Sequence, residues 1–417
     1  MSENSADPTE QLNIANDDII KGFQIVEKID EGAYGQVFKV SKSSKKYAMK
    51  VEANRCDGGQ SSIRKEMEII QVLNANNAPY FPKLVYSGMD LKFSMLVMTL
   101  LGENLKKLRM KCADPYSCTT GTWSRVGIQC LYVLKQMHDC GLLHHDLKPS
   151  NFVMGNPEEP ILCRVFHLID FGISRKFIRV KKGAPIQQPI PRKHLECRQP
   201  RKVINALVGT PTYASPNAHL MVDLSRVDDC WSLLYMVGEM VKPLPWDSLE
   251  GKQLETVKLK TKLQDIFNNS AFNAVEEMLR ACDFYSFPNY ELIYNSFKTV
   301  FGKSGVTWVD PYDWESKQMS SYINWKKGAD NRSQLFPWES ADVSNFFKED
   351  PFKLCRLTLK NSDATVKKNP AKHTSKENLD GTLVTEATCE EILNTHASTT
   401  KLKQCKGKEV KKVALPK

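Results

Sequence analysis

The sequence has no long hydrophobic run and no paired cysteines of the kind that bind zinc. Its longest apolar run, around residues 95–101, is far shorter than the roughly 20 residues that a membrane-spanning helix needs. The polar, acidic start lacks the basic and then apolar pattern of a secretory signal. The 12 cysteines are scattered, and no C-x-x-C pair is followed by a second pair at zinc-ligand spacing. We therefore expect reduced thiols, no transmembrane segment, and a location in the cytoplasm or the nucleus.

Aromatic residues are scarce at both ends of the chain. Residues 1–19 are polar, and residues 352–417 are rich in Lys, Thr, Ser and Asn with little periodicity, so both segments are predicted to be disordered. From Pro351 onward there are 14 Lys/Arg against 7 Asp/Glu, which accounts for most of the formal net charge of +10. No aromatic side chain interleaves these lysines after Phe352, which favours a solvated charge run over a nucleic-acid site. No specific nucleic-acid partner is expected.

The centre of the chain changes from strand patterns to helix patterns. Residues 23–51 alternate in the manner of three short strands, residues 63–73 carry a helical apolar stripe, and residues 93–100 form another strand pattern. Helices are expected over residues 123–140, 228–241, 252–268 and 270–282. The prediction is an α+β protein of two lobes, with a small antiparallel β-rich lobe over about 20–101 and a large helical lobe over about 102–320. An extension over 321–351 precedes the tail.

The octapeptide His-His-Asp-Leu-Lys-Pro-Ser-Asn at residues 144–151 carries the strongest chemical signal. Phosphoryl transfer needs metal-held phosphates, a positioned hydroxyl and charge stabilisation. Asp146 would accept the proton of a substrate hydroxyl, Lys148 would steady the transferring phosphoryl group, and Asn151 would hold Mg²⁺. The alternative is a loop in which the Asp and Asn side chains merely cap turns.

A second motif, Ile-Asp-Phe-Gly at residues 169–172, follows about twenty residues later. Asp170 would bind the metal that bridges the β- and γ-phosphates. Asp-x-Gly alone is ordinary turn chemistry. Its distance from the first motif is what favours a metal-binding role.

Lys50 ends the apolar strand pattern Tyr-Ala-Met-Lys, where it could pair with the α- and β-phosphates. A solvent-exposed strand lysine is the alternative. Its expected partner is Glu66 on the following helix, because Glu66 lies one turn from Ile63 and Ile70 on the side that should face the sheet. Glu68 is the competing partner.

A glycine-containing turn lies between the first two expected strands. Gly32 and Gly35 would let backbone amides approach phosphate, and Val37 would cover the adenine. Asp30 replaces the first glycine of the full Gly-x-Gly-x-x-Gly pattern. A plain hairpin turn is therefore an open alternative.

Over roughly residues 23–314 the chain resembles eukaryotic protein kinases. The segment Gly-Thr-Pro-Thr-Tyr-Ala-Ser-Pro-Asn-Ala-His at residues 209–219 resembles the Ser-x-Asn-x-His variant of the casein kinase 1 superfamily, and Asp-Asp-Cys-Trp-Ser-Leu at 228–233 agrees with it. Residues 149–155 and 312–315 are most similar to its tau-tubulin kinase branch.

This resemblance implies a two-lobed serine/threonine protein kinase with ATP and Mg²⁺ between the lobes. It implies a hinge at residues 99–101, a gatekeeper at Met98, and further ATP contacts from Ala48 and Leu101. Lys148, two residues after the catalytic Asp, is the serine/threonine pattern. The alternative function is a catalytically weak, nucleotide-binding pseudokinase scaffold, suggested by Asp30 and by His145 in place of the usual Arg. We expect a monomer.

Substrate selection departs from the family pattern. Thr212 stands where the superfamily usually has an Arg that contributes to an anion site for primed substrates. Residues 175–202 hold ten basic residues and one acid, Glu196, which predicts a diffuse preference for Ser/Thr substrates in an acidic context. The preference is expected to depend on Arg192, Lys193, Arg201 and Lys202.

Overall fold

The computed structural model describes residues 14–32, 35–54, 62–90, 92–159, 162–182, 194–202, 204–318, 320–327 and 337–353. All of them belong to the compact unit Met1–Ala364, whereas the second unit, Thr365–Lys417, lies outside the described residues. The predicted disorder of residues 1–13 and 354–417 therefore also falls outside them. The same holds for Ala33 and Tyr34 of the glycine turn and for residues 183–193.

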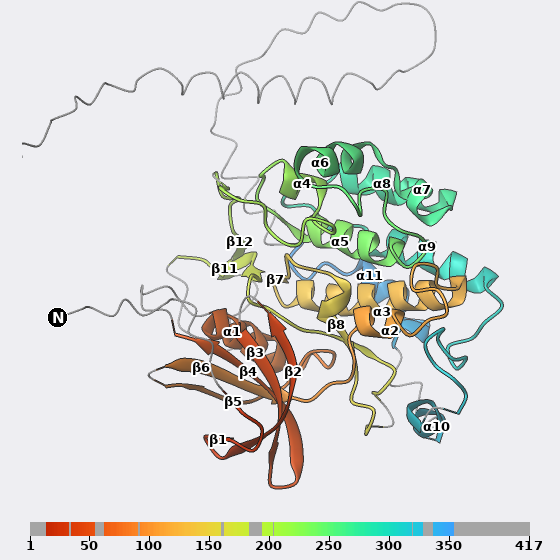
Figure 1. Ribbon diagram of the computed structural model, residues 1–417. Helices are drawn as coiled ribbons and strands as arrows, with labels where there is room; N and C mark the ends of the chain where they lie inside the picture. The colour runs from red at the N-terminus through yellow and green to blue at the C-terminus, as the bar shows by residue number, and fades with distance from the viewer. Residues whose placement is uncertain are drawn as a thin grey trace, which may run out of the picture. The chain divides into compact units, whose positions relative to one another are not determined.

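The small lobe is a six-stranded antiparallel sheet in the order β1-β2-β3-β4-β6-β5, with helix α1 (Ser62–Ala75) packed on it (Figure 1). Its strands are β1 (Ile19–Ile20), β2 (Phe23–Gly32), β3 (Gly35–Lys42), β4 (Lys45–Ala53), β5 (Leu84–Met89) and β6 (Phe93–Thr99). Alternate residues of β2, β3 and β4 are buried, including Ile25, Val40 and Val51, and they form a core of their own. The period-2 pattern thus produces a sheet with one buried face.

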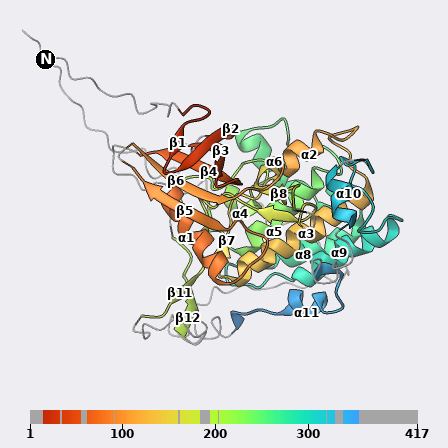
Figure 2. The same ribbon diagram turned by 90° about the horizontal axis from the view of Figure 1, so that it is seen from below.

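The large lobe is built around the buried helix α3 (Thr120–Asp139), which contacts α5 (Arg226–Gly238) and α9 (Tyr290–Lys303) (Figure 2). Both α3 and α5 are buried nearly all round, as expected for helices at the centre of a large core. The remaining helices are α2 (Leu105–Arg109), α4 (Pro216–His219), α6 (Gly251–Lys260), α7 (Leu263–Phe267), α8 (Asn273–Arg280), α10 (Ser320–Lys327) and α11 (Val343–Lys348).

Short strand pairs position the segments that carry the chemistry. Strand β8 (Phe152–Met154) pairs with β9 (Phe166–Leu168), and these strands flank the segments of Asn151 and Asp170. Strand β7 (Leu142–Leu143) pairs with β10 (Arg175–Lys176), just before and just after those same segments. A third pair joins β11 (Ile178–Val180) to β12 (Leu195–Cys197). The two loops are therefore held at both ends.

Several boundaries differ from those predicted. The continuous helix over 252–268 is wrong: the backbone becomes extended at Thr261 and Lys262, which lets α7 turn Leu263 and Ile266 into the core. Strand β5 and helix α9 were not predicted. The prediction that residues 1–19 are disordered is wrong for residues 14–19. The backbone N of Asp17 donates to the Ile25 carbonyl, and the backbone N of Ile25 donates to the Asp18 carbonyl.

The boundary of the tail also moves. Phe352, placed in the tail by its sequence context, packs with Leu143, Phe177 and Cys197 in a small hydrophobic cluster.

None of the described helices is long and apolar enough to cross a membrane. The cysteines that the structure describes are all free thiols, and most are buried.

Candidate active site

Lys50, Glu66 and Asp170 form a connected ion-pair group between the two lobes. The Lys50 Nζ lies 2.7 Å from Glu66 Oε2 and 3.2 Å from Asp170 Oδ1. Glu68, the competing partner, instead lies 3.8 Å from Arg64 on the exposed face of α1. Burial by itself lowers the pKa of Lys50, but the two carboxylates outweigh it and the pKa is raised. Lys50 is thus held as a cation.

Asp146 is held by contacts from both sides of the site. Its Oδ2 accepts a hydrogen bond from Lys148 Nζ at 2.7 Å, and its Oδ1 accepts from the backbone N and Oγ1 of Thr210 at 2.9 and 2.7 Å. Asn151 Nδ2 donates to the Asp146 carbonyl at 2.8 Å. Gly209 has φ +88°, and a Cβ there would lie 2.5 Å from the His145 carbonyl, so only glycine lets Thr210 approach this closely.

The buried Asp229 of α5 supports this loop from below. Its carboxylate accepts from the backbone N of His144 and of His145, both at 2.8 Å, and contacts His138 Nε2 at 3.0 Å. Burial alone would raise its pKa, but the bond to His138 and nearby histidines lower it to about 2. His145 (φ +72°) and Asp170 (φ +67°) both have left-handed backbones, which the surrounding bonds maintain.

The predicted nucleotide-contacting residues line up on neighbouring strands. In the sheet register Gly32 lies opposite Gly35, Val37 opposite Lys50, and Ala48 opposite Met98. A Cβ at Gly35 (φ +127°) would lie 2.2 Å from the Val51 carbonyl. Leu101 follows β6, where the chain passes to the large lobe. The sheet therefore brings Gly32, Gly35, Val37, Ala48, Lys50 and Met98 onto neighbouring strands, whereas Glu66 lies on α1 and Leu101 follows the sheet.

The site suits a divalent cation held jointly with phosphates. Asp146 and Asp170 line the same small cavity, together with Ser62, Gly172 and Ile173. Asn151 is tied to this cavity through its carbonyl, which accepts from Ile169 N at 3.0 Å. Carboxylate and amide oxygens suit Mg²⁺, which keeps few protein ligands. Within the described ranges no cluster of three or more His, Cys, Asp or Glu could hold a metal by itself.

The activation segment, which follows Asp170, is held by an internal carboxylate. Asp223 accepts hydrogen bonds from Arg198 and from the backbone N, Nε and Nη2 of Arg201. Burial would raise its pKa, yet these arginines hold the pKa well below its ordinary value.

The nearby His145 is buried, and neither ring nitrogen has a hydrogen-bond partner in the described structure. Burial, with Arg175 and Arg198, lowers the pKa of His145 to about 4, so it is neutral at pH 7.

The segment around Thr212 is fixed by a buried lysine of α6. Lys258 Nζ donates to the carbonyls of Pro211, Thr212 and Ala214 at 2.6–3.0 Å, and Trp246 Nε1 also donates to Thr212 at 2.9 Å. Burial lowers the pKa of Lys258 to about 7. The carbonyls are satisfied internally, and the Thr212 side chain adds no positive charge for a phosphate.

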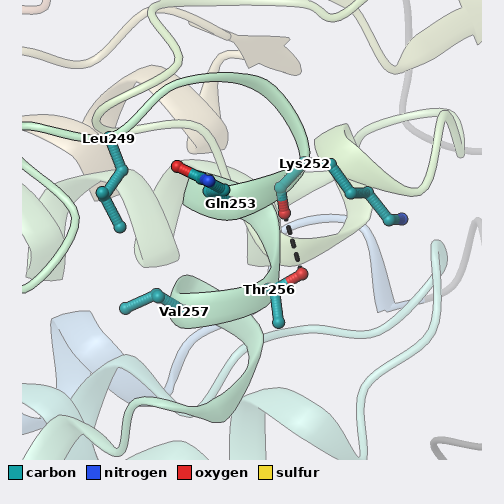
Figure 3. Close-up of a pocket in the computed structure, with 5 residues that line it drawn as sticks. All are labelled: Leu249, Lys252, Gln253, Thr256 and Val257. Atoms are coloured by element: carbon teal, nitrogen blue, oxygen red, sulfur yellow. Dashed lines mark hydrogen bonds between the residues drawn. The ribbon is translucent and has the colours of Figure 1, made fainter.

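A second hollow lies on α6, outside this constellation. Figure 3 shows that it is lined by Leu249 and Val257 with Lys252, Gln253 and Thr256, and that the Thr256 hydroxyl bonds to the Lys252 carbonyl at 2.8 Å. None of the predicted site residues lines it. It holds no pair of groups that could accept a proton or bind a metal.

Two residues that contact the loop were not singled out as site residues from the sequence. Thr210 contacts Asp146 across 64 positions of sequence, and Asp229 binds the backbone of His144 and His145. Both lie in segments that carried the family resemblance. Only the resemblance of these two segments to the family pattern could have indicated Thr210 and Asp229. Local spacing in the sequence does not reveal contacts between residues so far apart.

Comparisons with known proteins agree with this geometry. The protein kinase domain model matches residues 23–311. The chain is 33% identical to a Caenorhabditis elegans protein named as a serine/threonine-protein kinase, covering 80% of this chain and 93% of that one. It is 31% identical to an inactive tau-tubulin kinase of the same organism (69% and 95%) and 27% identical to casein kinase I homolog 1 of Saccharomyces cerevisiae (70% and 53%). The chain belongs to the protein kinase family, within the casein kinase 1 superfamily and similar to its tau-tubulin kinase branch.

Proposed function

We propose that this chain is an active kinase that transfers the γ-phosphate of ATP to Ser and Thr hydroxyls of proteins. The observation that supports this best is the Asp146 carboxylate, held by Lys148 and Thr210 beside the cavity that also contains Asp170. A positioned carboxylate next to a metal-binding carboxylate is what hydroxyl phosphorylation requires.

Each residue has a distinct part in this proposal. ATP would supply the phosphoryl group, and a bound Mg²⁺ would partly neutralise the charge of its phosphates. Lys50, kept charged by Glu66, orients the α- and β-phosphates, while Asp170 and Asn151 supply oxygen ligands. Asp146 orients the incoming hydroxyl and accepts its proton, and Lys148 stabilises negative charge on the transferred group.

The second candidate function is a catalytically weak, nucleotide-binding pseudokinase scaffold, and one relative named as inactive favours it. Against it, Lys50, Asp146, Asn151 and Asp170 are all present and mutually arranged. A nucleotide-binding assay combined with a phosphate-transfer assay distinguishes the two. A scaffold would bind nucleotide without transferring phosphate.

Three further proposals concern the context of the enzyme. We propose Mg²⁺ as the metal, because a site with few protein ligands beside phosphates suits it better than Ca²⁺. We propose that the protein acts as a monomer. We propose a cytoplasmic or nuclear location, as expected in the sequence analysis.

A preference for acidic substrates is proposed from the exposed basic residues near the activation segment. The expected contribution of Arg201 as a free charge is wrong, because its guanidinium is bound to Asp223. Arg192 and Lys193 lie outside the described residues. Lys176, Lys182 and Lys202 remain exposed there and form no ion pair within the described ranges. Over a Debye length of about 8 Å such charges attract acidic peptides diffusely.

Replacing these three lysines together by Ala should raise KM for an acidic Ser peptide by about tenfold while sparing kcat, since attraction acts on encounter and binding. The wild-type preference should shrink as salt is raised. Lys298→Ala, Lys303→Ala and Lys317→Ala together remove the same charge elsewhere and are the matched control. A triple variant that keeps the acidic preference, or equal effects of both triples, would contradict the proposal.

Activity without activation-segment phosphorylation is expected, because Asp223 already anchors Arg198 and Arg201 and because neutral His145 cannot pair with a phosphate. Protein from bacteria, treated with phosphatase, should show full activity. Asp223→Ala should lower kcat by about tenfold, as for a lost positioning contact. An enzyme that stays silent until an upstream kinase phosphorylates it would refute this prediction.

A further inference from the structure

Residues 337–353 lie beyond the part of the chain matched by the kinase domain, yet they pack into the large lobe. They comprise a 3-10 turn (Pro337–Glu339), which contacts α3, and α11, which contacts α9. Figure 2 shows α11 at the edge of the large lobe. Trp338 is 2% exposed and Phe347 is fully buried. We call residues 337–353 the C-terminal strap.

The first anchor of the strap, Trp338, contacts a residue that bonds to the strand leading into Asp170. The Trp338 ring lies 5.9 Å from the Tyr80 ring, between α1 and β5, and 5.6 Å from the Tyr132 ring on α3. The Tyr80 carbonyl accepts from the backbone N of Leu168 at 3.1 Å, two residues before Asp170. Only one residue thus separates Trp338 from the strand that leads into Asp170.

The neighbouring residue adds a second link to the same motif. The Phe81 ring lies 6.2 Å from Phe171, which directly follows Asp170. The segment holding Tyr80 and Phe81 therefore bonds to the end of β9 through the Tyr80 carbonyl and packs on the Asp-Phe-Gly motif through the Phe81 ring. The strap contacts this segment through the Trp338 ring, which packs on the Tyr80 ring.

The other anchor supports the strands that flank the catalytic loop. Phe352 packs edge-to-face on Phe177 at 5.5 Å and joins Leu143, the residue before His144. Asp350 pairs with the buried Arg226 at 3.4 Å, and the Arg226 guanidinium lies 4.9 Å above the Phe177 ring. This end of the strap thus braces the β7–β10 pair.

Cation–π and aromatic contacts hold the strap between its anchors. The Lys135 ammonium of α3 binds Asp139 at 2.7 Å and lies 4.6 Å from the Phe346 ring centre. Tyr132 stacks on Phe346 at 4.3 Å. These contacts, with the burial of Trp338 and Phe347, make the strap part of the packed core.

We propose that the C-terminal strap is a positioning element of the kinase. Trp338 acts on Asp170 through Tyr80 and Leu168, and Phe352 acts on Asp146 through Leu143 and the β7–β10 pair. Neither residue touches substrate. Because packed interiors transmit displacement, loss of either ring would misplace a catalytic carboxylate and slow the chemical step.

The test uses the full chain with Trp338→Ala, compared with Trp325→Ala. Trp325 is similarly buried, at 3% exposure, but its ring packs on Tyr322 and lies 4.1 Å from the Arg164 guanidinium instead of packing on Tyr80. Assayed well below both melting temperatures, Trp338→Ala should lower kcat by about tenfold with little change in peptide KM. Trp325→Ala should lower the melting temperature by a similar amount and keep kcat.

Hydrogen exchange supplies a readout that global stability would not move selectively. The Leu168 amide should exchange faster in Trp338→Ala and at the wild-type rate in Trp325→Ala. Trp338→Phe, which keeps a ring against Tyr80, should restore most of kcat. If Trp338→Ala fails to fold, Phe352→Leu takes its place, with lost kcat as the expected result. Unchanged kcat in the folded strap variant, or equal kcat losses in strap variant and control, would overturn the proposal.

Discussion

Asp146→Asn should lower kcat by about two orders of magnitude or more while the protein still folds and binds nucleotide, because an amide cannot accept the hydroxyl proton. The substitution is nearly isosteric, so the contacts with Thr210 and Lys148 can persist in altered form. The measurement is steady-state peptide phosphorylation, with nucleotide-induced stabilisation as the folding control. Phosphorylation at close to the wild-type rate would remove Asp146 from this role.

Lys50→Met and Asp170→Ala should each reduce phosphate transfer to background. Lys50→Met leaves Glu66 buried without its counter-charge, and Asp170→Ala removes a carboxylate that faces the cavity. The two variants should differ in nucleotide binding: Asp170→Ala should lose the dependence on divalent metal, whereas Lys50→Met should weaken binding with and without metal. A titration with and without Mg²⁺ measures this difference.

Lys46→Met is a suitable control for the lysine variant. Lys46 lies on the same strand and pairs with Glu158 in an exposed ion pair. Such surface pairs contribute little to stability, about 0–1 kcal/mol. Activity lost equally in both lysine variants, or retained in both catalytic variants, would contradict the assigned roles.

The catalytic loop and the Asp-Phe-Gly motif could be predicted from sequence because phosphoryl transfer demands particular groups at short spacing. The pairing of Lys50 with Glu66 followed from helical periodicity, since Glu66 shares a face with Ile63 and Ile70, and all three are buried. Local chemistry and local periodicity therefore accounted for the acidic and basic groups of the site.

What sequence reasoning missed depends on contacts between distant segments. The Thr210–Asp146 hydrogen bond joins residues 64 positions apart. Arg201, expected from the sequence to be a free charge, is bound to Asp223. The break between α6 and α7, at Thr261 and Lys262, contains no proline or glycine that would predict the end of a helix. It arises because Leu263 must turn toward the core. Helix α9 could have been predicted from the sequence, since its buried residues lie at helical spacing.

The strap was beyond any local pattern. Residues 337–353 have helical and aromatic features, but their partners Tyr80 and Phe177 lie more than 150 positions away. Periodicity reports which face of an element is apolar and not which element covers it. Only the folded chain shows that this segment packs on residues next to the loops of the active site.

The most direct test of the central claim is phosphate transfer by the purified, dephosphorylated full chain. Wild-type protein and Asp146→Asn are incubated with Mg²⁺ and γ-labelled ATP on a Ser/Thr peptide library, and labelled phosphoamino acids are counted. We predict labelled phosphoserine and phosphothreonine with the wild type, reduced by about 100-fold in the variant. Nucleotide binding by both proteins with no more label from the wild type than from the variant would show a scaffold instead of an enzyme.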